Sequence, residues 1–197
     1  MSSKSKAIAA LLLLALVFSG GFYAGLKYAE PQTIAGNGEL VAVQEIETVF
    51  TPYQNGLGAY LNFLSKAKQS VLIACYGFTE ADIVDKLIEL KNKNVSVKLL
   101  LDRSQSAGPY QKVQIERLRK AGIEVVVGTS EKSGQIMHNK FTIVDGEWVE
   151  DGSWNYSNSA DKQANTQNYV HSKKRAELFT EYWQRMYRFM SKQGQSH

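Results

Sequence analysis

The chain has 197 residues, of which 44% are hydrophobic, enough for one domain with a well-formed core and a short additional segment. Its single cysteine, Cys75, excludes an internal disulfide and a cysteine-rich zinc site. Residues 1–30 hold three of the 23 basic residues and one of the 19 acidic residues. The rest of the chain therefore has 20 basic and 18 acidic residues. So small a surplus does not by itself indicate a nucleic-acid-binding protein.

The N-terminal stretch at residues 7–26, AIAALLLLALVFSGGFYAGL, carries no charge and follows Lys4 and Lys6. Residues 1–26 are therefore predicted to be either a secretory signal peptide, cleaved near Ser19, or a transmembrane anchor. No A-x-A triplet follows the apolar stretch, which favours the anchor. In a bacterial cell both alternatives place the rest of the chain outside the cytoplasm, periplasmic or secreted, because flanking lysines stay on the inner side.

Residues 27–44 contain Pro, Gly and Asn without clear periodicity and are predicted to be a linker. Strands and helices then alternate. Strands are predicted at 45–50, 70–78, 95–102 and 123–127, and helices at 56–68, 79–93 and 110–122. This alternation predicts an α/β fold with a mixed, largely parallel β-sheet flanked by helices. Cys75 lies in a continuous apolar run and is predicted to be a small buried hydrophobe and not a nucleophile.

The pattern changes in the last third of the chain. Residues 137–151 are predicted to form a β-hairpin, 166–172 a strand and 173–190 a long amphipathic helix. The predicted domain spans residues 45–192, and residues 193–197 are left as a tail.

Four polar residues recur at matched spacing on and after this hairpin. The Asp-Gly pair at 145–146 lies between FTIV and EWVE, a strong signal for a two-residue turn, and such a turn places His138 opposite Ser153. His138 and Lys140 then share one face of their strand, Ser153 points to the same side, and Asn155 continues that face. An unpaired charge in an apolar strand is costly, so this spacing favours chemistry over a satisfied core histidine.

The chemistry that these residue types suit is the binding of an oxyanion, above all phosphate. Imidazole can act as a nucleophile or a general acid or base near neutral pH. Lys140 supplies a fixed positive charge, and Ser153 and Asn155 supply hydrogen-bond donors. A metal site is not predicted, because His138 has no His, Cys or carboxylate at ligand spacing and Lys140 would repel a cation. No cofactor is predicted.

This arrangement of residues resembles a known signature. The phospholipase D superfamily pattern H-x-K-x4-D-x6-G-S-x-N is matched at every specified position by His138, Lys140, Asp145, Gly152, Ser153 and Asn155. The resemblance extends over about residues 45–192 and is strongest to short members with one motif. These include plasmid-borne bacterial endonucleases and the mitochondrial cardiolipin hydrolase group.

The resemblance implies a phospholipase D-like fold and metal-independent phosphodiester hydrolysis through a covalent phosphohistidine. His138 would attack phosphorus, and a second histidine would protonate the leaving oxygen before it activates water. Lys140 and Asn155 would bind the phosphoryl oxygens, with Ser153 in support. Asp145 is expected to be structural, at the turn and outside the reacting groups.

The chain departs from the family pattern in two ways. It carries one motif where a full site needs two, so the resemblance implies a homodimer that shares its site across a two-fold axis. Short members also carry a glutamate beyond the asparagine that orients the histidine, and here Gln167 is expected at that position after a one-residue insertion. A glutamine can accept the hydrogen bond from His138 but cannot stabilise an imidazolium by charge.

Three functions follow from these observations. The first is an endonuclease that hydrolyses DNA or RNA, in keeping with the size class of the resembling proteins. The alternative is a phospholipase D that acts on phosphatidylcholine or cardiolipin, favoured by the N-terminal apolar segment, which would also bring the chain to a membrane. A weakly active binding module is the third, favoured by Gln167 alone. The basic residues of the last helix are either a track for a phosphate backbone or an ordinary solvated face: Lys173, Lys174, Arg175, Arg185 and Arg188.

Overall fold

The computed structural model describes residues 32–34, 40–42 and 45–193. The strands of its main sheet are β3 (Glu45–Thr51), β4 (Ser70–Cys75), β5 (Ser96–Asp102), β6 (Glu124–Gly128), β7 (Lys140–Val144), β8 (Trp148–Gly152) and β9 (Asn165–His171). The helices are α2 (Gly56–Leu64), α3 (Ala81–Asn92), α4 (Arg103–Ser106), α5 (Pro109–Lys120), the 3-10 helix η1 (Ala160–Lys162) and α6 (Lys173–Gln193). Each strand and long helix that the sequence predicts from residue 45 onward is thus present.

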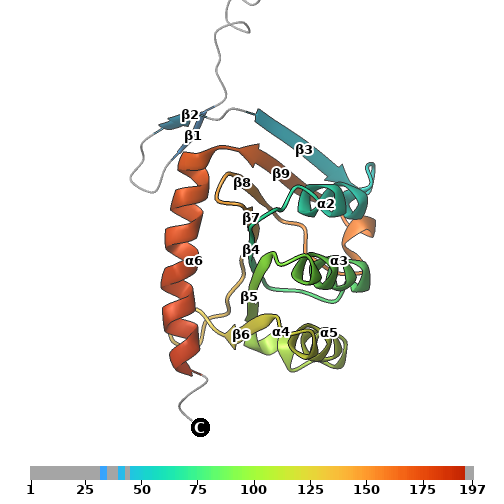
Figure 1. The fold of residues 1–197 in the computed structure, drawn as a ribbon, viewed down its shortest axis with the longest axis vertical. Helices are drawn as coiled ribbons and strands as arrows, with labels where there is room; N and C mark the ends of the chain where they lie inside the picture. The colour runs from blue at the N-terminus through green and yellow to red at the C-terminus, as the bar shows by residue number, and fades with distance from the viewer. Residues whose placement is uncertain (1–31, 35–39, 43–44, 194–197) are drawn as a thin grey trace, which may run out of the picture.

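The main sheet lies between two helical layers, with α2, α3 and α5 on one face and α6 on the other (Figure 1). The strand order is β3-β9-β8-β7-β4-β5-β6. Strands β4, β5 and β6 are parallel, whereas the pairs β4–β7, β7–β8, β8–β9 and β9–β3 are antiparallel. The predicted α/β fold and mixed sheet are confirmed.

The prediction that the sheet is largely parallel is wrong, since four of the six neighbouring strand pairs described above are antiparallel. The parallel expectation came from the alternating first half of the chain. Helix-containing crossovers of the kind that parallel neighbours need join β4 to β5 and β5 to β6, whereas β7, β8 and β9 follow one another on the other side of β4 without a long helix between them, and β3 pairs with β9 at the far edge.

Strand β4 is buried on both faces, as its continuous apolar sequence predicts. Val71, Ile73 and Cys75 pack into the core beneath α2 and α3, whereas Leu72 and Ala74 face the core beneath α6. Cys75 is fully buried, and burial raises the pKa of its thiol to about 12. The prediction that Cys75 is a buried hydrophobe is confirmed.

Helix α6 covers the second face of the sheet with one apolar stripe. Ala176, Trp183, Met186 and Met190 are buried and recur at helical spacing. The indole N–H of Trp183 donates a hydrogen bond of 2.8 Å to the carbonyl oxygen of Ile73, which fixes the helix against the centre of the sheet.

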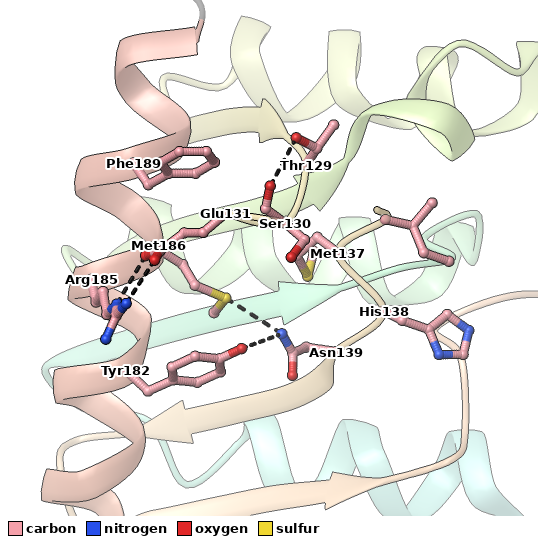
Figure 2. A pocket seen from close by; sticks show the side chains of 11 residues that line it. Thr129, Ser130, Glu131, Met137, His138, Asn139, Tyr182, Arg185, Met186 and Phe189 are labelled. Carbon is pink, nitrogen blue, oxygen red and sulfur yellow. Dashed lines mark hydrogen bonds and ion pairs between the residues drawn. The ribbon is translucent and has the colours of Figure 1, made fainter. Parts of the chain in front are cut away.

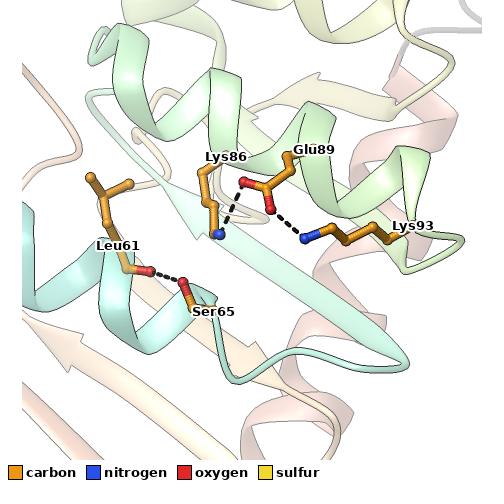
Figure 3. A network of polar contacts seen from close by, with 5 residues as sticks. All are labelled: Leu61, Ser65, Lys86, Glu89 and Lys93. Atoms are coloured by element: carbon orange, nitrogen blue, oxygen red, sulfur yellow. Dashed lines mark hydrogen bonds and ion pairs between the residues drawn. The ribbon is translucent and has the colours of Figure 1, made fainter.

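The outer surface of α3 carries charges that neutralise one another (Figure 3). The ammonium groups of Lys86 and Lys93 lie 3.0 Å and 2.5 Å from the carboxylate oxygens of Glu89. These hydrogen bonds, led by the one from Lys93, lower the pKa of Glu89 below its usual value. Close to this network the hydroxyl of Ser65 caps α2 by donating to the carbonyl of Leu61.

The segment predicted to be a linker contains two short strands, β1 (Gln32–Ile34) and β2 (Leu40–Ala42), which pair antiparallel with each other. The N-terminal hydrophobic helix predicted at residues 1–26 and the tail at 194–197 lie outside the described residues. Within the ranges that are described, no helix combines the length and apolar character needed to cross a bilayer.

Candidate active site

His138 lies just before β7, where the chain passes the end of β4. Its ring meets the ring of Tyr76 edge-on, with the two centroids 4.6 Å apart. The backbone N–H of Tyr76 donates to the carbonyl of Asn139 over 2.8 Å, which extends the pairing between β4 and β7 beyond the last ladder pair. His138 itself is exposed, and the residue after it is hydrogen-bonded to the segment that follows β4.

Lys140 begins β7 and lies on the same aromatic ring. Its ammonium group is 5.3 Å from the Tyr76 ring centroid and donates to the carbonyl oxygen of His138 over 2.9 Å. The residue is only 8% exposed, and burial lowers the pKa of its side chain. Among the described residues no carboxylate forms an ion pair with Lys140. A buried cation that no described carboxylate pairs forms a site that favours an anion.

Asn155 reaches the same place from the segment after β8. Its side-chain oxygen accepts a hydrogen bond from the backbone N–H of Gly77 over 3.3 Å. The structure thus brings His138, Lys140 and Asn155 together around Tyr76 and Gly77, at the carboxyl end of β4.

The predicted register of the hairpin is wrong by one residue. The turn contains Asp145, Gly146 and Glu147, so Val144 pairs with Trp148 and not with Glu147. Asp145 and Gly146 both have positive φ, 54° and 68°, and the backbone N–H of Glu147 donates to the carbonyl of Val144 over 3.1 Å, so the tight turn at Asp-Gly forms but Glu147 lies outside the ladder between β7 and β8.

Ser153 consequently does not lie opposite His138. Its hydroxyl donates to the side-chain oxygen of Asn165 over 3.0 Å and accepts from the backbone N–H of Thr166 over 3.1 Å. These bonds attach the end of β8 to β9, and through that attachment Ser153 supports the segment that carries Asn155.

The predicted hydrogen bond between Gln167 and His138 is not formed. Gln167 is fully buried, and its amide nitrogen lies 3.4 Å from the carbonyl oxygen of Gly56, at the start of α2. Its side-chain oxygen has no hydrogen-bond partner in the described structure. The pairing of Gln167 with Val49 and Gly152 directs the side chain toward α2, which the sequence spacing alone does not reveal.

Asp145 and Gly152 make their close contacts with the backbone of neighbouring segments, which agrees with the structural role expected for Asp145. The carboxylate of Asp145 accepts hydrogen bonds of 2.8 Å from the backbone N–H groups of Lys68, Gln69 and Ser70. It thereby attaches the hairpin turn to the beginning of β4. Gly152 lies where β9 approaches most closely.

An alanine at Gly152 is expected to destabilise the protein. The added Cβ would lie 2.0 Å from the carbonyl oxygen of Thr166, so β8 and β9 would have to move apart. Overpacking of this kind costs about 1–3 kcal/mol, and the free energy of unfolding, measured by urea titration, should fall accordingly. An unchanged midpoint and slope would contradict the close approach.

A buried polar network lies beneath β7. The hydroxyl of Tyr156 donates to a carboxylate oxygen of Glu150 over 2.5 Å and lies 2.8 Å from the hydroxyl of Thr142. Thr142 is two residues from Lys140, and Tyr156 adjoins Asn155, so the network joins the two segments that carry the site. Burial raises the pKa of Glu150 well above its usual range, and the other oxygen of this carboxyl has no hydrogen-bond partner among the described residues.

Replacing Glu150 with glutamine is expected to remove a pH dependence of stability. Because its folded-state pKa is raised, Glu150 keeps a proton that the unfolded chain releases, and the wild-type protein loses stability as pH rises above the ordinary carboxyl range. An amide at this position cannot ionise, so the stability of the Glu150→Gln variant relative to wild type should increase from acid to alkaline pH. Thermal unfolding at several pH values measures this, and parallel curves for both proteins would refute it.

Beside His138 a cleft of about 400 Å³ opens between α6 and the segment after β6 (Figure 2). Its apolar lining is Ile136, Met137, Tyr182, Met186 and Phe189. The guanidinium of Arg185 at the cleft forms a two-pronged contact with the carboxylate of Glu131, at 2.9 Å and 2.7 Å. Figure 2 shows His138 at one end of this cleft.

Tyr76 is the site residue that sequence reasoning missed. It contacts both His138 and Lys140, and its hydroxyl accepts a hydrogen bond of 2.9 Å from the side chain of Gln105 in α4. The available signal was its place in CYGFT, at the end of a buried strand where polar side chains of neighbouring strands converge.

Comparison with known proteins finds a matching family model and several relatives of similar sequence. The family model described as "Cardiolipin synthase, PLD-like domain" matches residues 60–189. A "Phospholipase D" of Rickettsia conorii is 32% identical over 141 residues, which is 71% of this chain and 68% of that protein. A "Mitochondrial cardiolipin hydrolase" of Chlamydomonas reinhardtii is 34% identical over 117 residues, 59% of this chain and 49% of that protein.

Among solved structures, the phospholipase D family member Nuc from Salmonella typhimurium superimposes with a TM-score of 0.69 at 27% identity. The match covers 73% of this chain and 94% of Nuc.

Proposed function

Because the chain belongs to the phospholipase D superfamily, we propose that it hydrolyses phosphodiesters through a covalent phosphohistidine at His138. The observation that supports this most is Lys140, a buried cation that no described carboxylate pairs, beside the exposed imidazole. Its charge, with the amide of Asn155, suits the two non-bridging oxygens of a phosphodiester.

The proposed reaction has two steps. A ring nitrogen of His138 attacks phosphorus, a P–N bond forms, the P–O bond to the leaving group breaks, and a second histidine gives its proton to the leaving oxygen. That histidine then takes a proton from water as the water oxygen attacks phosphorus, and cleavage of the P–N bond restores His138. Charge on the phosphoryl oxygens is greatest in both transition states, where Lys140 acts.

The second histidine is proposed to come from a second copy of the chain. Among the described residues the other histidine is His171, which pairs with Trp148 at the turn end of β8 and stacks on its ring at 4.3 Å. Lys140 lies at the opposite end of this hairpin, so His171 is remote from the site. We therefore propose a homodimer.

For the substrate, one observation favours the phospholipid alternative. The cleft beside His138 combines polar residues with an apolar wall of Ile136, Met137, Met186 and Phe189, and the cation Arg185 in its lining is neutralised by Glu131. On α6, Lys173 and Arg175 are likewise paired, with Glu147 and Asp151. A nucleic-acid backbone binds through unpaired cations, whereas an apolar wall suits the part of a lipid next to its head group.

Endonuclease activity stays the second candidate. It rests on the resemblance to short members with one motif, and the chain's likeness to Nuc over 94% of that protein agrees with this size class. We also propose that residues 7–26 anchor the domain at the outer face of a membrane, a location that suits a phospholipid substrate. If this segment is cleaved instead, the domain would be periplasmic or secreted.

The deciding experiment offers phosphatidylcholine and cardiolipin vesicles, plasmid DNA and RNA to the purified chain, each with and without EDTA. Release of the lipid head group that persists in EDTA is the expected result. Cleavage of nucleic acid alone would support the second candidate, and hydrolysis that requires added divalent metal would overturn the phosphohistidine mechanism.

A further inference from the structure

The segment that carries His138 is attached to its surroundings on both sides of the histidine. Residues 135–139 lie between β6 and β7 and have no regular secondary structure (Figure 2). On one side, the carbonyl of Asn139 accepts the hydrogen bond from Tyr76 described above. On the other side, the backbone N–H of Met137 donates to the carboxylate of Asp102 over 2.8 Å. The place of His138 therefore depends on Asp102 as well as on the end of β4.

Asp102 ends β5, and it is fully buried. One carboxylate oxygen binds Met137. The other accepts hydrogen bonds from the backbone N–H and the hydroxyl of Ser104, over 2.9 Å and 2.5 Å, and from the backbone N–H of Gln105 over 3.3 Å. None of the ion pairs in the described ranges includes Asp102. Hydrogen bonds therefore compensate for the burial of this side chain, and bonds of this kind to a carboxylate are strong.

Gln105 makes a second connection between Asp102 and the histidine. Its side-chain amide donates to the hydroxyl of Tyr76 over 2.9 Å, and the ring of Tyr76 meets the ring of His138 edge-on. Asp102 caps α4 and so fixes the backbone from which Gln105 extends. The backbone before His138 and the ring beside it are thus both held, directly or through α4, by one buried carboxylate.

From these contacts we infer that Asp102 is a positioning residue, which fixes the His138 ring relative to Lys140 and to the phosphorus of the substrate. The inference rests on the proposed function, because the orientation of the imidazole affects the rate only if His138 is the nucleophile. Lys140 has its own support, since it pairs with Cys75 in the ladder between β7 and β4. A displacement of the reacting atoms by about 1 Å can cost about 100-fold in rate.

Replacing Asp102 with asparagine tests this role with little change of shape. Three donors meet at one carboxylate oxygen, so the single amide oxygen is expected to take that place. The amide NH2 then faces the N–H of Met137, and two donors cannot bond. With bis(4-nitrophenyl) phosphate, a soluble phosphodiester, kcat should fall by about 10- to 100-fold. KM should stay close to the wild-type value, because Lys140 and Asn155 still bind the phosphoryl oxygens.

The NMR signals of the His138 ring protons give a readout that does not depend on activity. The aromatic ring of Tyr76 shifts these signals, so a movement of the imidazole changes them. Asp102→Asn should move the His138 signals and leave those of His171, which stacks on Trp148, in place. The signals that disappear in His138→Ala identify the residue.

Two further variants of the full chain in detergent complete the test. Gln105→Leu removes the donor to Tyr76 at a partly buried position, and it should move the His138 signals and lower kcat in the same direction as Asp102→Asn. Leu87→Ala is the control for a general loss of stability, because Leu87 is fully buried in α3. At a temperature at which it is folded, Leu87→Ala should change neither the signals nor kcat.

Unmoved His138 signals in folded Asp102→Asn, a raised KM with unchanged kcat, or an equal fall of kcat in Leu87→Ala would overturn the inference. If Asp102→Asn does not fold, Gln105→Leu decides by the same criteria. Moved His138 signals in a chain that hydrolyses no phosphodiester would support the positioning role and refute the proposed function. Hydrolysis through His138 with signals that neither variant moves would do the reverse.

Discussion

Replacing His138 with alanine is expected to abolish hydrolysis, by about 10⁴-fold or more, the size of loss that follows removal of a nucleophile. The fold should survive, since the side chain is exposed and its ring packs against Tyr76 at the surface, outside the buried core. Head-group release and the thermal midpoint are to be measured on the same preparation.

His171→Ala is the matched control, because His171 is the other histidine in the described part of the chain and lies at the opposite end of the hairpin. It should retain wild-type turnover. If His138→Ala keeps more than a few per cent of the activity, the phosphohistidine mechanism is wrong. Trapping of a phosphorylated chain by rapid acid quench in wild type, and not in His138→Ala, would support it directly.

Replacing Lys140 with methionine is expected to lower turnover by about 100- to 1,000-fold, the range measured when one group that stabilises a developing oxyanion is removed. Methionine is close to lysine in length but carries no charge. Because Lys140 is buried and pairs with no carboxylate in the described part of the chain, its charge costs stability in the free protein. The Lys140→Met variant should therefore be as stable as wild type or more stable, while it is nearly inactive.

A pH–rate profile adds a further check on Lys140. Burial lowers the pKa of this lysine, and only the protonated form stabilises the phosphoryl oxygens. Wild-type activity should then decline at a pH below the ordinary lysine range, a decline that Lys140→Met lacks. Lys93→Met is a suitable control, since Lys93 pairs with Glu89 on the outer surface of α3 (Figure 3). A destabilised Lys140→Met variant with full activity would contradict the assignment.

The sequence by itself determined the class of the fold and the positions of its elements. The apolar run at 70–78 predicts a strand buried on both faces, and β4 is so buried. The motif spacing also indicated His138, Lys140 and Asn155 as one group, and the three do converge on Tyr76 and Gly77. These features depend on periodicity and on neighbours along the chain, which the sequence contains directly.

The hairpin register, the directions of two side chains and two pKa values depend on contacts between distant segments, so only the tertiary structure decided them. The hairpin register follows a three-residue turn that Asp145 holds by binding backbone N–H groups some 75 residues earlier, at the start of β4. The same one-residue shift, with the pairing of β9, directs Ser153 toward β9 and Gln167 toward α2. Burial likewise lowers the pKa of Lys140 and raises that of Glu150, since the free energy of a charge depends on the solvent that the whole fold excludes.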